Sequence, residues 1–226
     1  MPQDLFPARA SIAQKMVVAS TGLGLAGFVL FHMLGNLQVF EGPAALNSYA
    51  AFLRDMPILL WSVRLGLLAM LSLHLGLAIR LAVNNRRARP VAYASRDYRA
   101  ASLASRTMAL SGTLLLLFIL FHLLHLTFGV IDPAFAPATD AQGHRDVFGK
   151  VVHAFQNPLF VAFYLAGQLV LGLHLSHALS SSLQTLGVEH PTLERLFKGT
   201  GPVVALFVVL GNVAIILAIA VGIVRA

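Results

Sequence analysis

Six histidines lie inside long apolar stretches of this sequence, where an ionisable side chain is costly and calls for a partner. They are His32, His74, His122, His125, His174 and His177. The other three lie in polar segments and are expected to be exposed: His144, His153 and His190. Imidazole is the commonest metal ligand among side chains. The six therefore either bind metal together or hydrogen-bond separately to neighbouring helices.

The composition is that of an integral membrane protein. Of the 226 residues, 58% are hydrophobic and 11% are charged, which is too little charge to cover a soluble domain. No basic segment with a small-residue cleavage site opens the sequence, so the first apolar stretch is expected to be retained. The sequence has no cysteine, which excludes disulfides, thiolate metal sites and cysteine-ligated iron–sulfur clusters.

Five stretches are long enough to cross a bilayer core of about 30 Å as helices. The spans are expected at about 16–39, 60–83, 106–129, 158–181 and 202–224. The linkers are short and polar, with turn chemistry in "EGPAALNSY" and helix-start signals at 55–57 and 156–158. The sequence therefore predicts an all-α protein with one membrane domain over residues 1–226.

The basic residues predict the orientation, because cytoplasmic loops are rich in lysine and arginine. Eleven of the sixteen share one side of the predicted topology: Arg9, Lys15, Arg80, Arg86, Arg87, Arg89, Arg96, Arg99, Arg106, Arg195 and Lys198. The other five are Arg54, Arg64, Arg145, Lys150 and Arg225. This bias predicts a cytoplasmic N-terminus and an outside C-terminus in a bacterial inner membrane. Orientation and lipid contact then explain the net charge of +7 without a nucleic-acid partner.

The depths of four histidines fall into two levels at a rise of about 1.5 Å per helical residue. His32 in the first span and His122 in the third are expected about 7–9 Å toward the outside of the membrane centre. His74 in the second span and His174 in the fourth are expected about 4–7 Å toward the cytoplasm. Depth alone does not choose between His122 and the nearby His125, or between His174 and His177.

Two imidazoles from different helices at one depth suit bis-histidine ligation of a haem iron. Nine glycines on these spans leave room for a macrocycle or for close helix packing: Gly22, Gly24, Gly27, Gly35, Gly66, Gly76, Gly112, Gly167 and Gly172. Zinc is less suitable, because two ligands per level do not complete a tetrahedral site. The interpretation is a five-helix bundle that holds a haem at each of two levels.

The surroundings of these histidines resemble the five-helix, dihaem cytochrome b subunit of succinate:quinone oxidoreductases, the membrane anchor of succinate dehydrogenase and fumarate reductase. The similar segments are "FHMLGNLQVFEGPAALNSYAAFLR", "SGTLLLLFILFH" and "GLHLSHALSSSLQTLG". In that family a glycine precedes the third-span ligand by ten residues, as Gly112 precedes His122. The fourth-span ligand precedes a Leu–Gly pair, as His174 precedes Leu186 and Gly187.

The resemblance implies His32 with His122 as ligands of the outer haem, and His74 with His174 as ligands of the inner haem. His125 and His177 are then expected near the haem edges. It also implies partners on the cytoplasmic side, namely a flavoprotein that acts on succinate or fumarate and an iron–sulfur subunit. The basic segment 86–99 could dock these partners or contact lipid. The expected substrate of the membrane subunit is a quinone, with menaquinone favoured over ubiquinone.

Glu41, nine residues after His32, is a weak candidate for proton exchange with quinone, and a solvated loop carboxylate is the simpler interpretation. Another dihaem cytochrome b, of the hydrogenase or formate dehydrogenase type, fits the histidine count but not the surrounding segments. A proton-coupled transporter could use membrane histidines as relays. Such a transporter usually has inverted repeats or broken helices, and this sequence shows neither feature.

Overall fold

The computed structural model describes residues 8–88, 102–133, 139–140, 142–188 and 194–225. Five helices in these ranges are long and apolar enough to cross a membrane: Ser11–Glu41, Pro57–Arg87, Met108–Thr127, Pro158–Thr185 and Gly199–Ala220. Most of their large apolar side chains point outward, as Leu68 and Leu210 do, which suits contact with lipid. The all-α class and the five apolar spans are thereby confirmed.

The helices of the first, second and fourth spans extend past the predicted limits, whereas the third span is shorter at both ends and the fifth begins and ends earlier than predicted. The five spans are α1 (Ala8–Asn36) with the 3₁₀ turn η1 (Leu37–Glu41), α3 (Pro57–Arg87), α5 (Met108–His122) with the π-helical η2 (Leu123–Thr127), α7 (Pro158–Thr185) and α8 (Glu194–Ala220). A single short turn, α4 (Leu103–Arg106), precedes α5. Pro57 and Pro158 stand in the first turns of α3 and α7, where a missing N–H costs nothing. Asn157 caps α7 by accepting a bond from the Leu159 amide at 2.9 Å.

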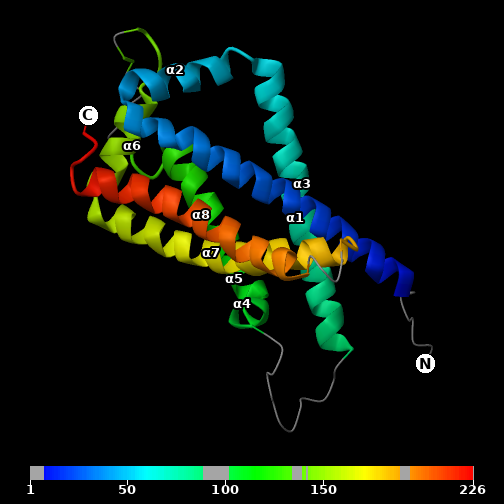
Figure 1. Ribbon diagram of the computed structural model, residues 1–226. Helices are drawn as coiled ribbons and strands as arrows, with labels where there is room; N and C mark the ends of the chain where they lie inside the picture. The colour runs from blue at the N-terminus through cyan, green and yellow to red at the C-terminus, as the bar shows by residue number, and fades with distance from the viewer. Residues whose placement is uncertain (1–7, 89–101, 134–138, 141, 189–193, 226) are drawn as a thin grey trace.

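The linkers between the first and second spans and between the third and fourth spans each contain a helix. The turn predicted in "EGPAALNSY" is limited to Gly42, and the remainder of this segment begins α2 (Pro43–Arg54). Gly42, with φ of 98°, turns the chain, and Pro43 starts the helix. Before the fourth span lies α6 (Val147–Gln156), whose buried face includes Phe148, Val152 and Phe155. Both helices lie at the end of the bundle where α1 ends (Figure 1). We call this the outer end, after the predicted orientation.

Asn47 joins α2 to the start of α6. Its side chain is 1% exposed, and its Oδ1 accepts bonds from the Val147 and Phe148 amides at 2.9 Å each. Its Nδ2 donates to Asp146 Oδ1 at 3.1 Å, and the same oxygen accepts from the Gly149 amide. One asparagine therefore satisfies two of the amides that a helix start leaves without intrahelical partners.

We expect Asn47→Ala to lower the free energy of unfolding by about 1–3 kcal/mol, because buried amides lose their acceptor. Thermal melting of the purified protein in detergent would measure this. Ser48→Ala is the matched control, since Ser48 is exposed on the same helix. Equal melting temperatures for the two variants would contradict a structural role for the Asn47 bridge.

The four histidine-bearing helices are arranged so that each predicted ligand pair spans a diagonal. α1 packs against α3 and α7, and α5 packs against α7. Among the described residues, neither α1 with α5 nor α3 with α7 forms an extensive contact. The side between α3 and α5 is also without extensive contact, and α3 diverges from the other helices (Figure 1). His32 on α1 and His122 on α5 nevertheless approach each other across one of these diagonals.

The fifth span closes the opposite side. α8 packs along α7 and also contacts α1. Within the apolar interface, Asn212 Nδ2 donates to Gln168 Oε1 at 3.0 Å, so two polar side chains satisfy each other. No histidine lies on α8, so this helix packs against the bundle and supplies no imidazole ligand.

Candidate functional site

The structure places the four predicted ligands on two levels. His32 and His122 lie four and five residues before their segments end at Asn36 and Thr127, which is about 6–8 Å from the outer end. His74 and His174 lie 17 and 16 residues after their helices begin at that end, which is about 24–26 Å away. We call these the outer pair and the inner pair. Their role as ligands stays a prediction.

The outer pair lies ring to ring between α1 and α5, with the His32 side chain exposed and that of His122 half-buried. The ring centroids of His32 and His122 are 6.0 Å apart, and the ring planes are inclined at 87°. Because a metal–imidazole bond is about 2 Å long, two imidazoles on opposite sides of one ion have centroids about 6 Å apart. Phe28 and Phe118 stack beside the two rings, with centroids 5.4 and 6.2 Å away. The spacing of the outer pair therefore fits axial ligation of one iron.

Hydrogen bonds already engage the rings of the outer pair. Asn36 Nδ2 lies 3.3 Å from His32 Nε2 and can donate to it, so a metal at that nitrogen would replace the amide. His122 Nδ1 lies 3.5 Å from the hydroxyl oxygen of Tyr164. Tyr164 is 3% exposed and stands on α7 among aromatic rings. Tyr164 therefore holds the His122 ring at Nδ1 and leaves Nε2 available.

His125 and His177 occupy different surroundings. His125 is 1% exposed, lies in the π-helical η2, and has Nδ1 3.1 Å from the Tyr164 hydroxyl. Its ring packs on Phe160 at a centroid distance of 4.2 Å. Tyr164 thus lies between His122 and His125. His177 is only half-buried on α7. The expectation that these two histidines lie near haem edges stays a prediction.

Both rings of the inner pair are held by hydrogen bonds at Nδ1. His74 Nδ1 lies 3.1 Å from the Val18 carbonyl oxygen, an acceptor, so this nitrogen carries the proton. His174 Nδ1 lies 3.1 Å from Ser111 Oγ, and Ser111 itself can donate to the Met108 carbonyl at 3.2 Å. The His74 lone pair is then on Nε2, the nitrogen available to a metal, and the same holds for His174 when the Ser111 hydroxyl donates to Met108 and accepts from Nδ1.

Two glycines make room for these rings. A Cβ at Gly22 on α1 would lie 3.1 Å from His74 Cε1, and a Cβ at Gly112 on α5 would lie 3.4 Å from His174 Cε1. Alanine at Gly22 would crowd the His74 ring, whereas alanine at Gly112 would make ordinary van der Waals contact, so only a larger side chain there would displace the His174 ring. Gly22 and Gly112 therefore let each inner histidine pack against the neighbouring helix.

Two imidazoles at one level suit a metal ion whose remaining ligands come from a bound cofactor and not from the protein. Among the described residues, no three or more His, Asp or Glu side chains converge on a common point that could hold a metal. A free ion bound by two imidazoles alone would lack its remaining protein ligands. Haem iron needs only axial ligands, because the macrocycle fills the plane. The histidine pairs therefore fit haem better than a bare metal ion.

A polar pocket opens at the outer end. It is lined by Ile131, Asp132, His153, Gln156, Asn157, Pro158 and Phe160. Asp132 Oδ2 and His153 Nε2 lie 3.2 Å apart within it. Nearby, burial lowers the pKa of Lys150, and Arg145 lowers it further, while Asp132 opposes the shift. Because Phe160 also packs on His125, the pocket reaches the aromatic cluster around Tyr164.

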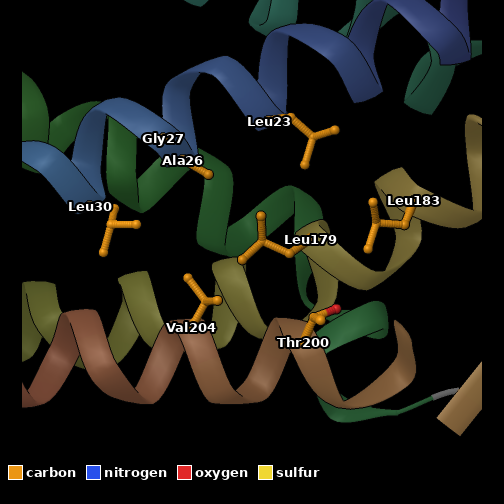
Figure 2. Close-up of a pocket in the computed structure, with 8 residues that line it drawn as sticks. All are labelled: Leu23, Ala26, Gly27, Leu30, Leu179, Leu183, Thr200 and Val204. Carbon is orange, nitrogen blue, oxygen red and sulfur yellow. The ribbon is translucent and has the colours of Figure 1, made fainter. Parts of the chain in front are cut away.

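A second pocket is apolar and lies between α1, α7 and α8 (Figure 2). Its lining residues are Leu23, Ala26, Gly27, Leu30, Leu179, Leu183, Thr200 and Val204. The side chains from three helices point into a shared space whose only hydroxyl belongs to Thr200. With no histidine in its walls, this pocket suits a hydrocarbon chain and not a metal.

Other predicted residues lie apart from these sites or outside the described residues. Glu41 ends η1 and is exposed, in keeping with a solvated carboxylate, and its role toward quinone stays a prediction. Most of the basic segment 86–99 lies outside the described residues, as does His190. His144 and His153 lie at the outer end, where Asp140 and Asp132 respectively pair with them.

Sequence reasoning missed the residues that hold the imidazoles, namely Tyr164, Ser111 and Thr21. Thr21 Oγ1 lies 3.4 Å from His74 Nδ1. A signal was present in the spacing, because Thr21 and Ser111 each precede an outer histidine by eleven residues. Eleven residues make about three helical turns and thus return to the same face. A polar side chain on the histidine face of an apolar helix was the available clue.

Comparison of the chain with protein-family models, with curated proteins and with solved structures finds no match.

Proposed function

We propose that the chain is the membrane cytochrome b subunit of a succinate:quinone oxidoreductase, carrying two b haems. The observation that carries this proposal is the arrangement of four histidines on four helices at two depths, with the outer pair ring to ring and each inner imidazole held at Nδ1 by the neighbouring helix. Isolated membrane histidines that only bond to neighbouring helices have no reason to pair in this way. The resemblance of the segments around them selects this family among the dihaem cytochromes.

In this proposal the haems supply one-electron transfer, and the chain positions them and sets their potentials. His74 and His174 hold the inner haem on the side of the cytoplasmic flavoprotein and iron–sulfur partners. His32 and His122 hold the outer haem, about 16 Å further along the helices by the eleven-residue interval from Thr21 to His32. Haems held by these residues would supply electron transfer between the cytoplasmic partners and the outer level, outward during succinate oxidation and inward during fumarate reduction.

Quinone would then react at the outer level, where reduction to quinol takes up two electrons and two protons. The polar pocket at the outer end supports this placement, because its lining combines apolar residues with the Asp132–His153 pair. Menaquinone and ubiquinone both fit this chemistry, and menaquinone is favoured. Carboxylate and imidazole groups of this kind exchange protons with bound substrates in many enzymes. Glu41 remains the alternative proton carrier.

We expect the purified protein to contain two haems per chain, both low-spin. A pyridine haemochrome assay with protein quantification measures the stoichiometry, and reduced-minus-oxidised spectra identify b-type haem. Co-purification of a flavoprotein and an iron–sulfur protein, with succinate-dependent haem reduction, would establish the family within the dihaem cytochromes. Protein that folds and binds no haem would overturn the proposal and favour a histidine-relay transporter. One haem per chain would overturn the two-level scheme.

A further inference from the structure

The two halves of the bundle repeat a pattern of residues around the histidines. "TGLGLAGFVLFH", residues 21–32, aligns with "SGTLLLLFILFH", residues 111–122, with six of the twelve positions identical. "LSLHLGLA", residues 71–78, aligns with "LGLHLSHA", residues 171–178, with five of the eight identical. In each half, a hydroxyl-bearing residue and a glycine precede the outer histidine, and "LHL" surrounds the inner one.

The repeated residues make equivalent contacts. α1 packs on α3 in the first half, and α5 packs on α7 in the second. In each half the hydroxyl of the first helix approaches Nδ1 of the inner histidine on the second helix, at 3.4 Å from Thr21 and 3.1 Å from Ser111. The following glycine leaves room for the ring of that histidine. The repeat therefore preserves a three-part unit of hydroxyl, glycine and imidazole.

The two units differ in what else binds Nδ1. His74 Nδ1 also lies 3.1 Å from the Val18 carbonyl, which remains if the Thr21 hydroxyl is removed. For His174 Nδ1, Ser111 Oγ is the one hydrogen-bond partner found among the described residues. The backbone therefore secures one inner imidazole, and a single side chain secures the other.

We propose that Ser111 is a positioning residue that orients the His174 imidazole and sets the reduction potential of the inner haem. This inference rests on the proposed function, because it takes His174 as an axial ligand. A hydrogen bond from Nδ1–H to an oxygen fixes the ring and raises the basicity of Nε2. A more basic ligand stabilises the ferric state, so the bond to Ser111 lowers the potential. Thr21 has the equivalent position, but Val18 makes it dispensable.

The test is a redox titration of the purified complex with Ser111→Ala, Ser111→Thr, Thr21→Val and Thr113→Val variants, followed by absorbance and by ferric electron paramagnetic resonance. Thr113 lies on the same helix as Ser111, but its hydroxyl bonds to the Ala109 carbonyl at 2.9 Å and is exposed. It is thus the matched control for loss of a hydroxyl from α5. Thr21→Val is the matched control for the equivalent hydroxyl in the other half.

Ser111→Ala is expected to raise the potential of the inner haem and to shift its low-spin ferric signal, while the outer haem keeps both. Ser111→Thr should restore the wild-type values, and Thr21→Val and Thr113→Val should shift them less than Ser111→Ala. Loss of the inner haem from Ser111→Ala alone, with Ser111→Thr retaining it, would also support positioning. An unchanged inner potential in Ser111→Ala, or haem loss from both Ser111 variants, would overturn this inference alone. Wild-type protein without haem would overturn the proposed function as well.

Discussion

Substitution of His122 with leucine should reduce the haem content from two per chain to one. His122 and His32 face each other at a centroid distance of 6.0 Å, so removal of one ring leaves the outer iron with a single axial ligand. Leucine has nearly the same volume as histidine and keeps the helix propensity high, so the bundle should persist. The remaining haem should be the inner one, bound by His74 and His174. Pyridine haemochrome quantification and a redox titration with one transition in place of two would measure this.

The matched control is His125→Gln, because His125 lies three residues later and binds the same Tyr164 hydroxyl. Glutamine keeps a donor for that contact, and this variant should retain two haems. If His125→Gln lost the outer haem while His122→Leu kept it, His125 would be the ligand and His122 the aromatic-cluster residue. Loss of one haem from His122→Leu together with two haems in His125→Gln would identify His122 as the ligand, a choice that depth alone does not make.

Much of the bundle was predictable because a bilayer imposes length and apolarity on each span. Five helices of the required character lie within a few residues of the predicted spans, and the start of α7 at Pro158 follows from the sequence of its cap. The levels of the four histidines follow from counting residues along these helices. Each of these predictions depends on one helix at a time, which a sequence describes well.

The features that involve contacts between segments were not predictable in this way. The α2 segment was interpreted as a turn, because its glycine, proline and asparagine are also loop residues. In the folded chain Asn47 is buried and satisfies amides of α6, a segment one hundred residues later. The π-helical η2 likewise has no local signal, and it lies where His125 packs between Phe160 and Tyr164. Such residues reveal their roles only when the partner segment is known.

Replacement of His174 with alanine should have the larger effect on function, because it removes the haem nearer to the cytoplasmic partners. His174 is the inner ligand on α7, and the Ser111 hydroxyl behind it cannot substitute as an iron ligand. In the complex purified with its flavoprotein and iron–sulfur subunits, the inner haem should be absent. Succinate should then reduce the outer haem only very slowly, because that haem is far from the iron–sulfur subunit. Quinone reduction by succinate should fall to the background level, while one haem per chain remains reducible by dithionite.

The matched control is His177→Ala, one helical turn further along the same helix and only half-buried. This variant should retain both haems and most of the succinate:quinone activity, with at most a shifted inner potential. Rapid mixing with succinate would separate the cases, because wild type should reduce the inner haem before the outer one. If the His174→Ala complex kept full quinone reductase activity with one haem per chain, quinone would react on the cytoplasmic side, and the proposed electron path through the outer level would be wrong.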